Sequence, residues 1–236
     1  PALRARLAAL IAGKTRDVRD HYRQMEVDLA DAQGRTLGLV LRAYDDGIAL
    51  RYRLPRPDAG DLVVKEDLTG FLFAHDYACW MLNLGTFGTA HEGEYDPVAA
   101  SKLRAMHLIE LPLVCRTGDG EASFAIAEAD LDRYAGLYLG GRGDGRLGVQ
   151  ARLSPRLDEH GVAVRLPHAD VAAEGHLTPW RVLMLGDSPG ALIESNLISS
   201  LNPPTPIADT SWIRPGKTAW DWWSGSIAPD VADAGM

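Results

Sequence analysis

The first part of the chain alternates apolar and polar residues with a period of two, which is typical of β-strands. Met25, Val27 and Leu29 share one face of the segment 22–29, and polar residues occupy most of the other, so a half-buried strand is predicted there. The alternation returns over residues 37–44 and 48–54. Aspartates followed by glycine at 45–47 indicate a hairpin turn between these two segments. Residues 22–54 are therefore predicted to form a three-stranded antiparallel meander.

Later segments continue the β pattern. Residues 111–115 and 121–127 read as strands joined by a Gly/Asp turn, and residues 181–185 are apolar on both faces after Arg181, which predicts a strand buried on both sides. Five glycines between 140 and 148 predict a loop rather than a core element. Helices are predicted only over residues 2–11 and around 190–200. Spaced strands with Gly/Asp turns favour a mainly β sandwich.

Composition narrows the class of function. The 236 residues carry a formal net charge of −8, which argues against a protein that binds nucleic-acid phosphates through basic patches. The hydrophobic fraction of 46% is enough for a packed core, and no run of about 18 apolar residues predicts a membrane-spanning helix. Cys-x-x-Cys and His-Glu-x-x-His spacings are absent, so a zinc site is not expected, whereas calcium needs no sequential motif.

Glu128 is the first carboxylate to weigh. It continues the parity of Ala122, Phe124 and Ile126, so its side chain is expected on the apolar face where the strand ends. Asp130 shares this parity. A carboxylate at this place is either a functional ligand or the cap of a following helical turn, and the sequence pattern leaves both readings open.

Three further groups carry candidate chemistry. His91 has the neighbouring carboxylates Glu92 and Glu94, which form either an acid–base pair or a solvated loop. Cys79 and Cys115 can pair in an oxidising compartment, although buried thiols are the preferred interpretation. Trp80 and Trp180 are expected in the core, whereas four of the six tryptophans follow residue 211 and form either core or a sugar-stacking pocket.

Several short motifs occur in one order along the chain, and together they resemble glycoside hydrolase family 97, the Sus-type α-glucosidases and α-galactosidases. The quoted segments are Arg19-Asp-His-Tyr22, Arg42-Ala-Tyr-Asp-Asp-Gly47, Arg51-Tyr52, Ala127-Glu-Ala-Asp-Leu131, Thr178-Pro-Trp-Arg-Val182, Ser195-Asn-Leu197, Leu201-Asn-Pro203, Asp209-Thr-Ser-Trp212, Pro215-Gly-Lys217 and Trp220-Asp-Trp-Trp-Ser-Gly225. The resemblance extends over nearly the whole chain from about Gly13.

The resemblance implies a fold and a domain division. Residues 1–205 would form an antiparallel β-super-sandwich similar to galactose mutarotase, with its first strands preceding Pro1. Residues 206–236 would hold a linker and the first strand of a truncated (β/α)8 barrel. Such a barrel needs about 250 residues, so the resemblance implies that the rest of it lies outside this chain.

The resemblance also implies a function. The parent protein would be a calcium-dependent glycosidase acting on α-glucosides or α-galactosides, with its acid and base in the barrel and no catalytic residue in this chain, which alone would be inactive. Glu128 would supply a calcium ligand, and Trp220, Asp221 and Trp222 would line the substrate pocket. Partners would be an α-glycoside or oligosaccharide and the missing barrel, in the periplasm or secreted. Ala127 departs from the threonine expected there.

A second interpretation is a stand-alone carbohydrate-binding or mutarotase-like sandwich. That function needs its own concave pocket with a His/Glu acid–base pair, for which His91 with Glu92 or Glu94 are the candidates. A third interpretation is a structural or interaction domain, in which Glu128 is only a cap.

Overall fold

The structure is a computed structural model that describes residues 4–6, 15, 18–118, 120, 122–156, 161–213 and 217. Its strands are β1 (Arg4–Arg6), β2 (Val18–Asp20), β3 (Arg23–Ala30), β4 (Thr36–Tyr44), β5 (Gly47–Leu54), β6 (Leu62–Val64), β7 (Gly70–Leu72), β8 (Ala78–Met81), β9 (Asp96–Ala99), β10 (Leu113–Arg116), β11 (Ser123–Ala129), β12 (Leu137–Gly141), β13 (Gly148–Leu153), β14 (Val164–Leu166), β15 (His176–Leu177) and β16 (Trp180–Gly186). The helices are α1 (Pro189–Glu194) and α2 (Leu197–Leu201), with 3-10 turns η1 (Ala100–Lys102) and η2 (His168–Asp170).

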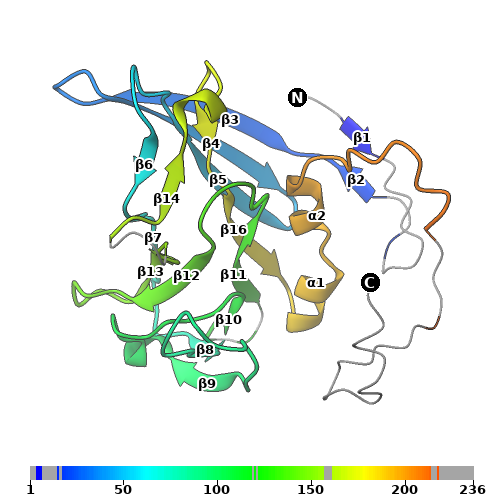
Figure 1. Cartoon of the computed structure of the whole chain (residues 1–236). Helices are drawn as coiled ribbons and strands as arrows, with labels where there is room; N and C mark the ends of the chain where they lie inside the picture. Colours follow the sequence, from blue (N-terminus) through cyan, green and yellow to red (C-terminus); the bar gives the residue numbers. More distant parts are fainter. Residues whose placement is uncertain are drawn as a thin grey trace, which may run out of the picture.

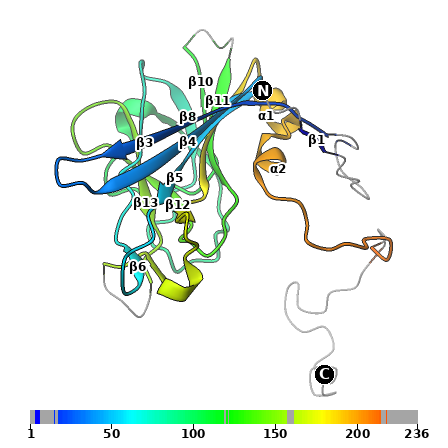
Figure 2. The same ribbon diagram turned by 90° about the horizontal axis from the view of Figure 1, so that it is seen from above.

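One long antiparallel sheet organises the molecule. Its order is β3-β4-β5-β16-β11-β10-β8-β9, and β15 adds to β5. A three-stranded sheet of β12, β13 and β7 lies on one side of it, and α1 and α2 lie on the other (Figure 1). Seen from above, the β3–β4 hairpin projects beyond the rest of the sheet (Figure 2). The mainly β, antiparallel sandwich predicted from the sequence is confirmed.

The predicted meander is confirmed in its strands and its turn. β3, β4 and β5 pair in sequence, with Met25 opposite Leu41 and Leu41 opposite Leu50. The prediction that residues 22–29 are half-buried is wrong, because every residue of β3 except Val27 is exposed. β3 is the edge strand, and the small sheet covers only the other half of the long sheet.

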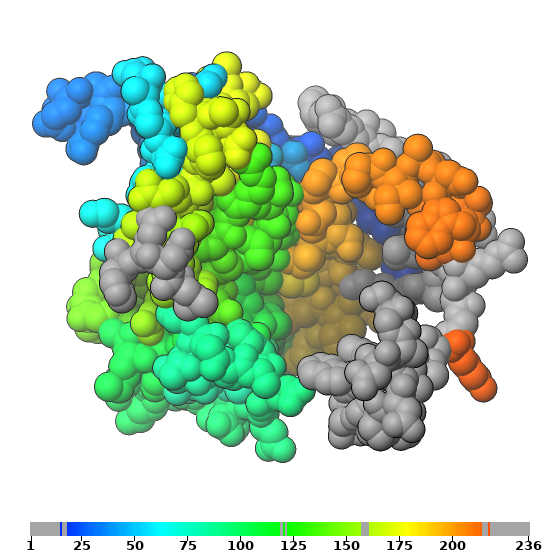
Figure 3. All heavy atoms as spheres, in the orientation of Figure 1, coloured from blue at the N-terminus to red at the C-terminus, as the bar shows by residue number. Residues whose placement is uncertain are grey.

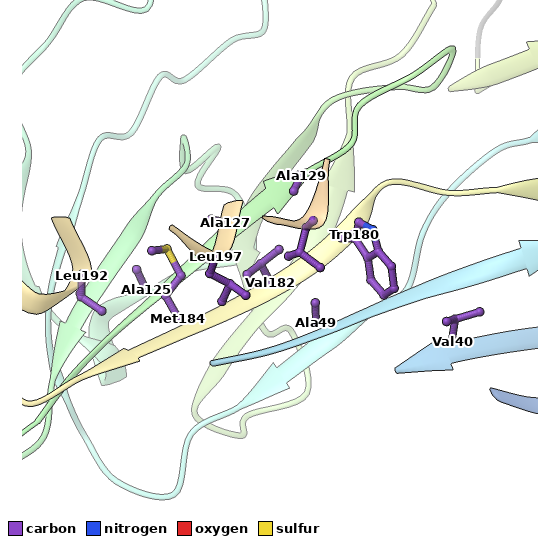
Figure 4. Packing of buried hydrophobic residues seen from close by; sticks show 11 residues of the cluster. Val40, Ala49, Ala125, Ala127, Ala129, Trp180, Val182, Met184, Leu192 and Leu197 are labelled. Carbon is purple, nitrogen blue, oxygen red and sulfur yellow. The ribbon is translucent and has the colours of Figure 1, made fainter. Parts of the chain in front are cut away.

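Alternate residues of the long sheet fill two cores. On the helix-covered face, the small side chains of Ala125, Ala127 and Ala129 leave room for Leu192 and Leu197 of the two helices (Figure 4). Trp180 is fully buried in this core, as predicted. On the sandwich face, Leu113, Cys115 and Ile126 pack against the small sheet, whose members there include Leu139 and Val149.

The helices match the sequence pattern near the end of the chain but not near its beginning. Ser188 caps α1 by accepting a hydrogen bond from the Ala191 N–H at 3.2 Å, and Pro189 occupies the first turn. The helix predicted over residues 2–11 is wrong in its described part, where Arg4–Arg6 form β1 and pair with β2. A short isolated helix is marginal in water, whereas strand pairing satisfies these backbone groups.

Two other expectations need correction. The glycine-rich segment is a loop only between Gly141 and Gly148, because Gly140 and Gly141 belong to β12 and Gly148 begins β13. A Cβ on Gly141 would lie 2.5 Å from the backbone N of Arg104, so a close backbone contact explains this glycine. Cys79 and Cys115 are joined in a disulfide, so the preference for buried thiols is wrong; the pairing of β8 with β10 sets them opposite each other.

Candidate functional site

Glu128 lies near the end of β11, where its carboxylate is 10% exposed. The alternative that it caps a helical turn is wrong, because Ser123–Ala129 form a strand and no helix follows in residues 130–136. Its Oε2 accepts a hydrogen bond from the Leu137 N–H at 3.1 Å, at the start of β12. Glu128 therefore connects the long sheet to the three-stranded sheet.

Arg181 is the buried partner of Glu128. The two residues are opposite each other in the β11–β16 register, and Arg181 Nη1 donates to Glu128 Oε1 at 2.5 Å. The Arg181 side chain has no exposed surface, and its other edge donates to Asp67 Oδ2 from Nε at 3.0 Å and from Nη2 at 2.8 Å. One guanidinium therefore bridges two carboxylates from different parts of the chain.

Asp67 lies between β6 and β7 and is fixed by its own neighbours. Its Oδ1 accepts from the Thr69 N–H at 2.8 Å and from the Thr69 hydroxyl at 2.5 Å. Because the Thr69 proton goes to Asp67, the Tyr52 hydroxyl 2.8 Å away donates to Thr69. A chain of hydrogen bonds thus runs from Tyr52 on β5 through Asp67 and Arg181 to Glu128.

Burial dominates the electrostatics of this cluster. Burial raises the pKa of Glu128 above its usual range, and the charge of Arg181 opposes this rise. Burial also raises the pKa of Tyr134 to about 12, so the phenol beside the cluster stays neutral at pH 7. With Arg181 cationic and both carboxylates ionised, Asp67, Arg181 and Glu128 together carry one net negative charge.

Glu128 also borders a cavity of about 730 Å³. The cavity lies between α1 and the loops before β10 and β12, and Figure 3 shows the green surface of the strands meeting the gold surface of the helices along this side. Its walls are mostly apolar, with Val114, Ala125, Met184 and Leu192 among them, and its polar groups include Glu110, Glu128 and Tyr138. A carboxylate beside an apolar wall suits a ligand that has both hydroxyl groups and apolar faces.

The His91 acid–base pair is formed with a residue that the sequence analysis did not name. His91 Nδ1 lies 2.9 Å from Glu110 Oε1, so the expected partnership with Glu92 or Glu94 is wrong. Both of those glutamates are exposed. The His91 backbone has a φ of 59°, which turns its ring back toward the loop before β10.

The fit of a calcium ion to this site rests on the donor chemistry of Glu128. A carboxylate has about four acceptor positions, and Arg181 and the Leu137 N–H use two of them, so hard oxygen donors remain for a cation. The net negative charge of the cluster favours a cation as well. Within the described ranges, no three His, Cys, Asp or Glu side chains gather as a metal site, so Glu128 fits as one ligand among others supplied from elsewhere.

The other predicted site residues stand apart from this cluster. Trp220, Asp221 and Trp222 lie outside the described residues, as does the predicted barrel strand. Asp130 adjoins Glu128 in sequence, but its carboxylate pairs with Arg51 at 3.0 Å. The domain division at residue 205 stays a prediction.

Sequence reasoning missed Asp67, Arg181 and Glu110 as site residues. Arg181 carried a usable signal, because a charged residue in a strand that is apolar on both faces is rarely buried without a paired charge. Asp67 and Glu110 carried none, since each lies in an irregular segment whose spatial neighbours are distant in sequence.

Comparison with known proteins decides the family. The sequence profile described as Glycosyl-hydrolase 97 N-terminal matches residues 7–204. The chain belongs to glycoside hydrolase family 97. It is 30% identical over 226 residues to the retaining alpha-galactosidase of Bacteroides thetaiotaomicron, an alignment that covers 88% of this chain and 33% of that protein. The chain thus spans about a third of the length of this curated relative.

Solved structures agree with the family assignment. A family-97 enzyme from Pseudoalteromonas sp. strain K8 in complex with acarbose superposes with a TM-score of 0.74 and 27% identity, covering 86% of this chain and 29% of that one. The same enzyme has been crystallised with panose. A beta-arabinopyranosidase matches with a TM-score of 0.60 and 25% identity over 74% of this chain and 29% of its own. Family-97 relatives of this chain are therefore glycoside hydrolases.

Proposed function

We propose that this chain is the sandwich part of a calcium-dependent α-glycosidase, in which Glu128 supplies one calcium ligand and the sandwich completes the sugar site. Membership of family 97 and an alpha-galactosidase relative support α-galactosides or α-glucosides as substrates. The observation that carries the role of Glu128 is its carboxylate at the edge of a large cavity, in a cluster with net negative charge. The catalytic acid and base would come from the barrel of the same polypeptide.

The chain's own residues have separable roles in this proposal. Arg181 and the Leu137 N–H hold both oxygens of Glu128 in one orientation, so the carboxylate loses little freedom on binding a cation. The apolar wall that includes Val114 and Met184 excludes water and strengthens electrostatic interactions beside it. When bound, calcium would supply positive charge that orients substrate oxygens.

The test compares Glu128→Gln with Glu92→Gln in the complete protein, because Glu92 is an exposed carboxylate on a loop. Titration calorimetry with CaCl2 should show calcium affinity at least about tenfold weaker for Glu128→Gln, since one hard anionic ligand becomes a neutral amide. The Glu92→Gln affinity should match the parent. Equal calcium affinities for parent and Glu128→Gln would refute the ligand role.

A second measurement concerns the division of labour. The 236-residue chain should not hydrolyse p-nitrophenyl α-galactoside or α-glucoside, whereas the complete protein should hydrolyse at least one of them. Hydrolysis by the chain alone would contradict the proposal that the acid and base lie in the barrel.

We infer extracytoplasmic localisation, periplasmic or secreted, from the disulfide between Cys79 and Cys115. Disulfides persist in oxidising compartments and are rare in the cytosol. Alkylation and mass spectrometry of the native protein would test this: two alkylated thiols would oppose it.

A stand-alone mutarotase-like function is the second candidate, because His91 and Glu110 pair at 2.9 Å and Glu110 borders the same cavity as Glu128. Polarimetry of freshly dissolved α-D-galactose and α-D-glucose distinguishes it from the first. The chain should leave mutarotation at the uncatalysed rate. Acceleration that disappears in His91→Asn would favour this second function instead.

A further inference from the structure

The position of Glu128 raises an electrostatic difficulty for cation binding. Its Oε1 is 2.5 Å from Arg181 Nη1, and a guanidinium this close would repel a second cation. A single glutamate paired with a single arginine is neutral, so it offers a metal ion no net attraction. Another charge must offset that of Arg181 if Glu128 is to attract a cation.

Asp67 supplies that charge from the buried side. Arg181 directs Nε and Nη2 to Asp67 Oδ2, at 3.0 and 2.8 Å, and only Nη1 to Glu128. The Asp67 side chain is 4% exposed and that of Glu128 is 10% exposed, so Asp67 is the inner carboxylate and Glu128 the outer one. The surplus negative charge of the cluster can therefore act at the cavity edge, where Glu128 lies.

Asp67 is also fixed in place by groups that take no part in binding Arg181. Its second oxygen, Oδ1, is held by the backbone and hydroxyl of Thr69, and Tyr52 in turn holds that hydroxyl. Both oxygens of Asp67 are thus satisfied with the side chain oriented toward Arg181. Such an arrangement orders the arginine before any ligand arrives.

We propose that Asp67 is a positioning residue for cation binding: it engages Arg181 so that Glu128 keeps a fixed orientation and a net negative environment. This inference rests on the proposed function of Glu128 and names a second residue on which the same site depends. Asp67 does not touch the cation, because it acts through Arg181.

The test is Asp67→Asn in the complete protein, with Asp76→Asn as the matched control. Asparagine keeps the shape of Asp67 and an acceptor oxygen but removes the charge, whereas Asp76 is an exposed aspartate bound to Ser101. Calcium affinity measured calorimetrically with CaCl2 should fall about tenfold or more in Asp67→Asn, the loss typical of outer groups that support metal ligands. Asp76→Asn should leave it unchanged.

A double-mutant cycle separates positioning from general damage. In a Glu128→Gln background, Asp67→Asn should cause no further loss of calcium affinity, because its route through Glu128 is already gone. An equal loss in both backgrounds, or no loss in either, would overturn the role of Asp67. No effect of Glu128→Gln alone would instead refute the proposed function, so the two failures are distinguishable.

A second variant covers the case in which Asp67→Asn does not fold. Thr69→Val removes the hydroxyl that donates to Asp67 at 2.5 Å but keeps every charge of the cluster. It should weaken calcium binding by about twofold to fivefold, in line with the loss of one hydrogen bond of about 0.5–1 kcal/mol. An affinity equal to that of the parent would count against the positioning role.

Discussion

Replacing Cys79 and Cys115 by alanine should lower the free energy of unfolding by about 4 kcal/mol or more. The disulfide closes a loop with a sequence separation of 36 residues. In the chain-entropy treatment, a loop of this length reduces the entropy of the unfolded chain by about 13 cal/mol/K, which is about 4 kcal/mol at 298 K. Both cysteines are buried in the sandwich core, so the lost side-chain volume adds to that figure.

Urea unfolding of the oxidised protein, the reduced protein and the double alanine variant separates these contributions. The reduced protein keeps both sulfurs, so its difference from the oxidised protein reports the covalent link alone. Tryptophan fluorescence is a suitable signal because Trp180 is fully buried in the native state. If oxidised and reduced protein unfold at the same urea concentration, the loop-closure reasoning is refuted.

Three further predictions concern buried charge, core packing and pH. Arg181→Met should cost about 3–5 kcal/mol of unfolding free energy because it leaves two buried carboxylates unpaired, whereas Arg53→Met in a more exposed ion pair should cost at most about 1 kcal/mol; urea unfolding measures both. Trp180→Ala should cost about 3–5 kcal/mol by the same assay and Trp212→Ala, which is 68% exposed in the parent, close to nothing; similar losses would contradict the core assignment. Burial lowers the pKa of His176, so the unfolded chain binds a proton more readily and stability is lost as pH falls through the usual value of 6.5; His176→Asn should lose less stability than the parent between pH 7.5 and about 5.5, and identical losses would refute this.

Local pattern predicted the elements that depend on neighbouring residues. The hairpin at residues 45–47, the strand that contains Arg181 and the helical turns after Ser188 all follow from period, turn chemistry and capping, which act over a few residues. The parity argument that places Glu128 on the same face as Ile126 is also confirmed, because Glu128 pairs with Arg181 as Ile126 pairs with Leu183.

Burial across the sheet was a different matter. β3 has the alternation of a half-buried strand and yet is exposed, since an edge strand is covered only where a second layer reaches it. The helix expected near Arg4 is a strand because β2, about fourteen residues later, provides a partner. Alternation reports a capacity to be buried on one face, but the packing of distant segments decides whether that face is covered.

The sequence by itself determined the family and the mainly β class, because many short motifs in one order and a repeated period of two are properties of the chain alone. Only the tertiary structure decided the partners of the charged groups. Asp67 and Arg181 are separated by 114 positions, and Glu110 and His91 by 19, so no local pattern could pair them. Strand register brought the two cysteines together in the same way. Charges and thiols act through space, and folding alone sets which of them become neighbours.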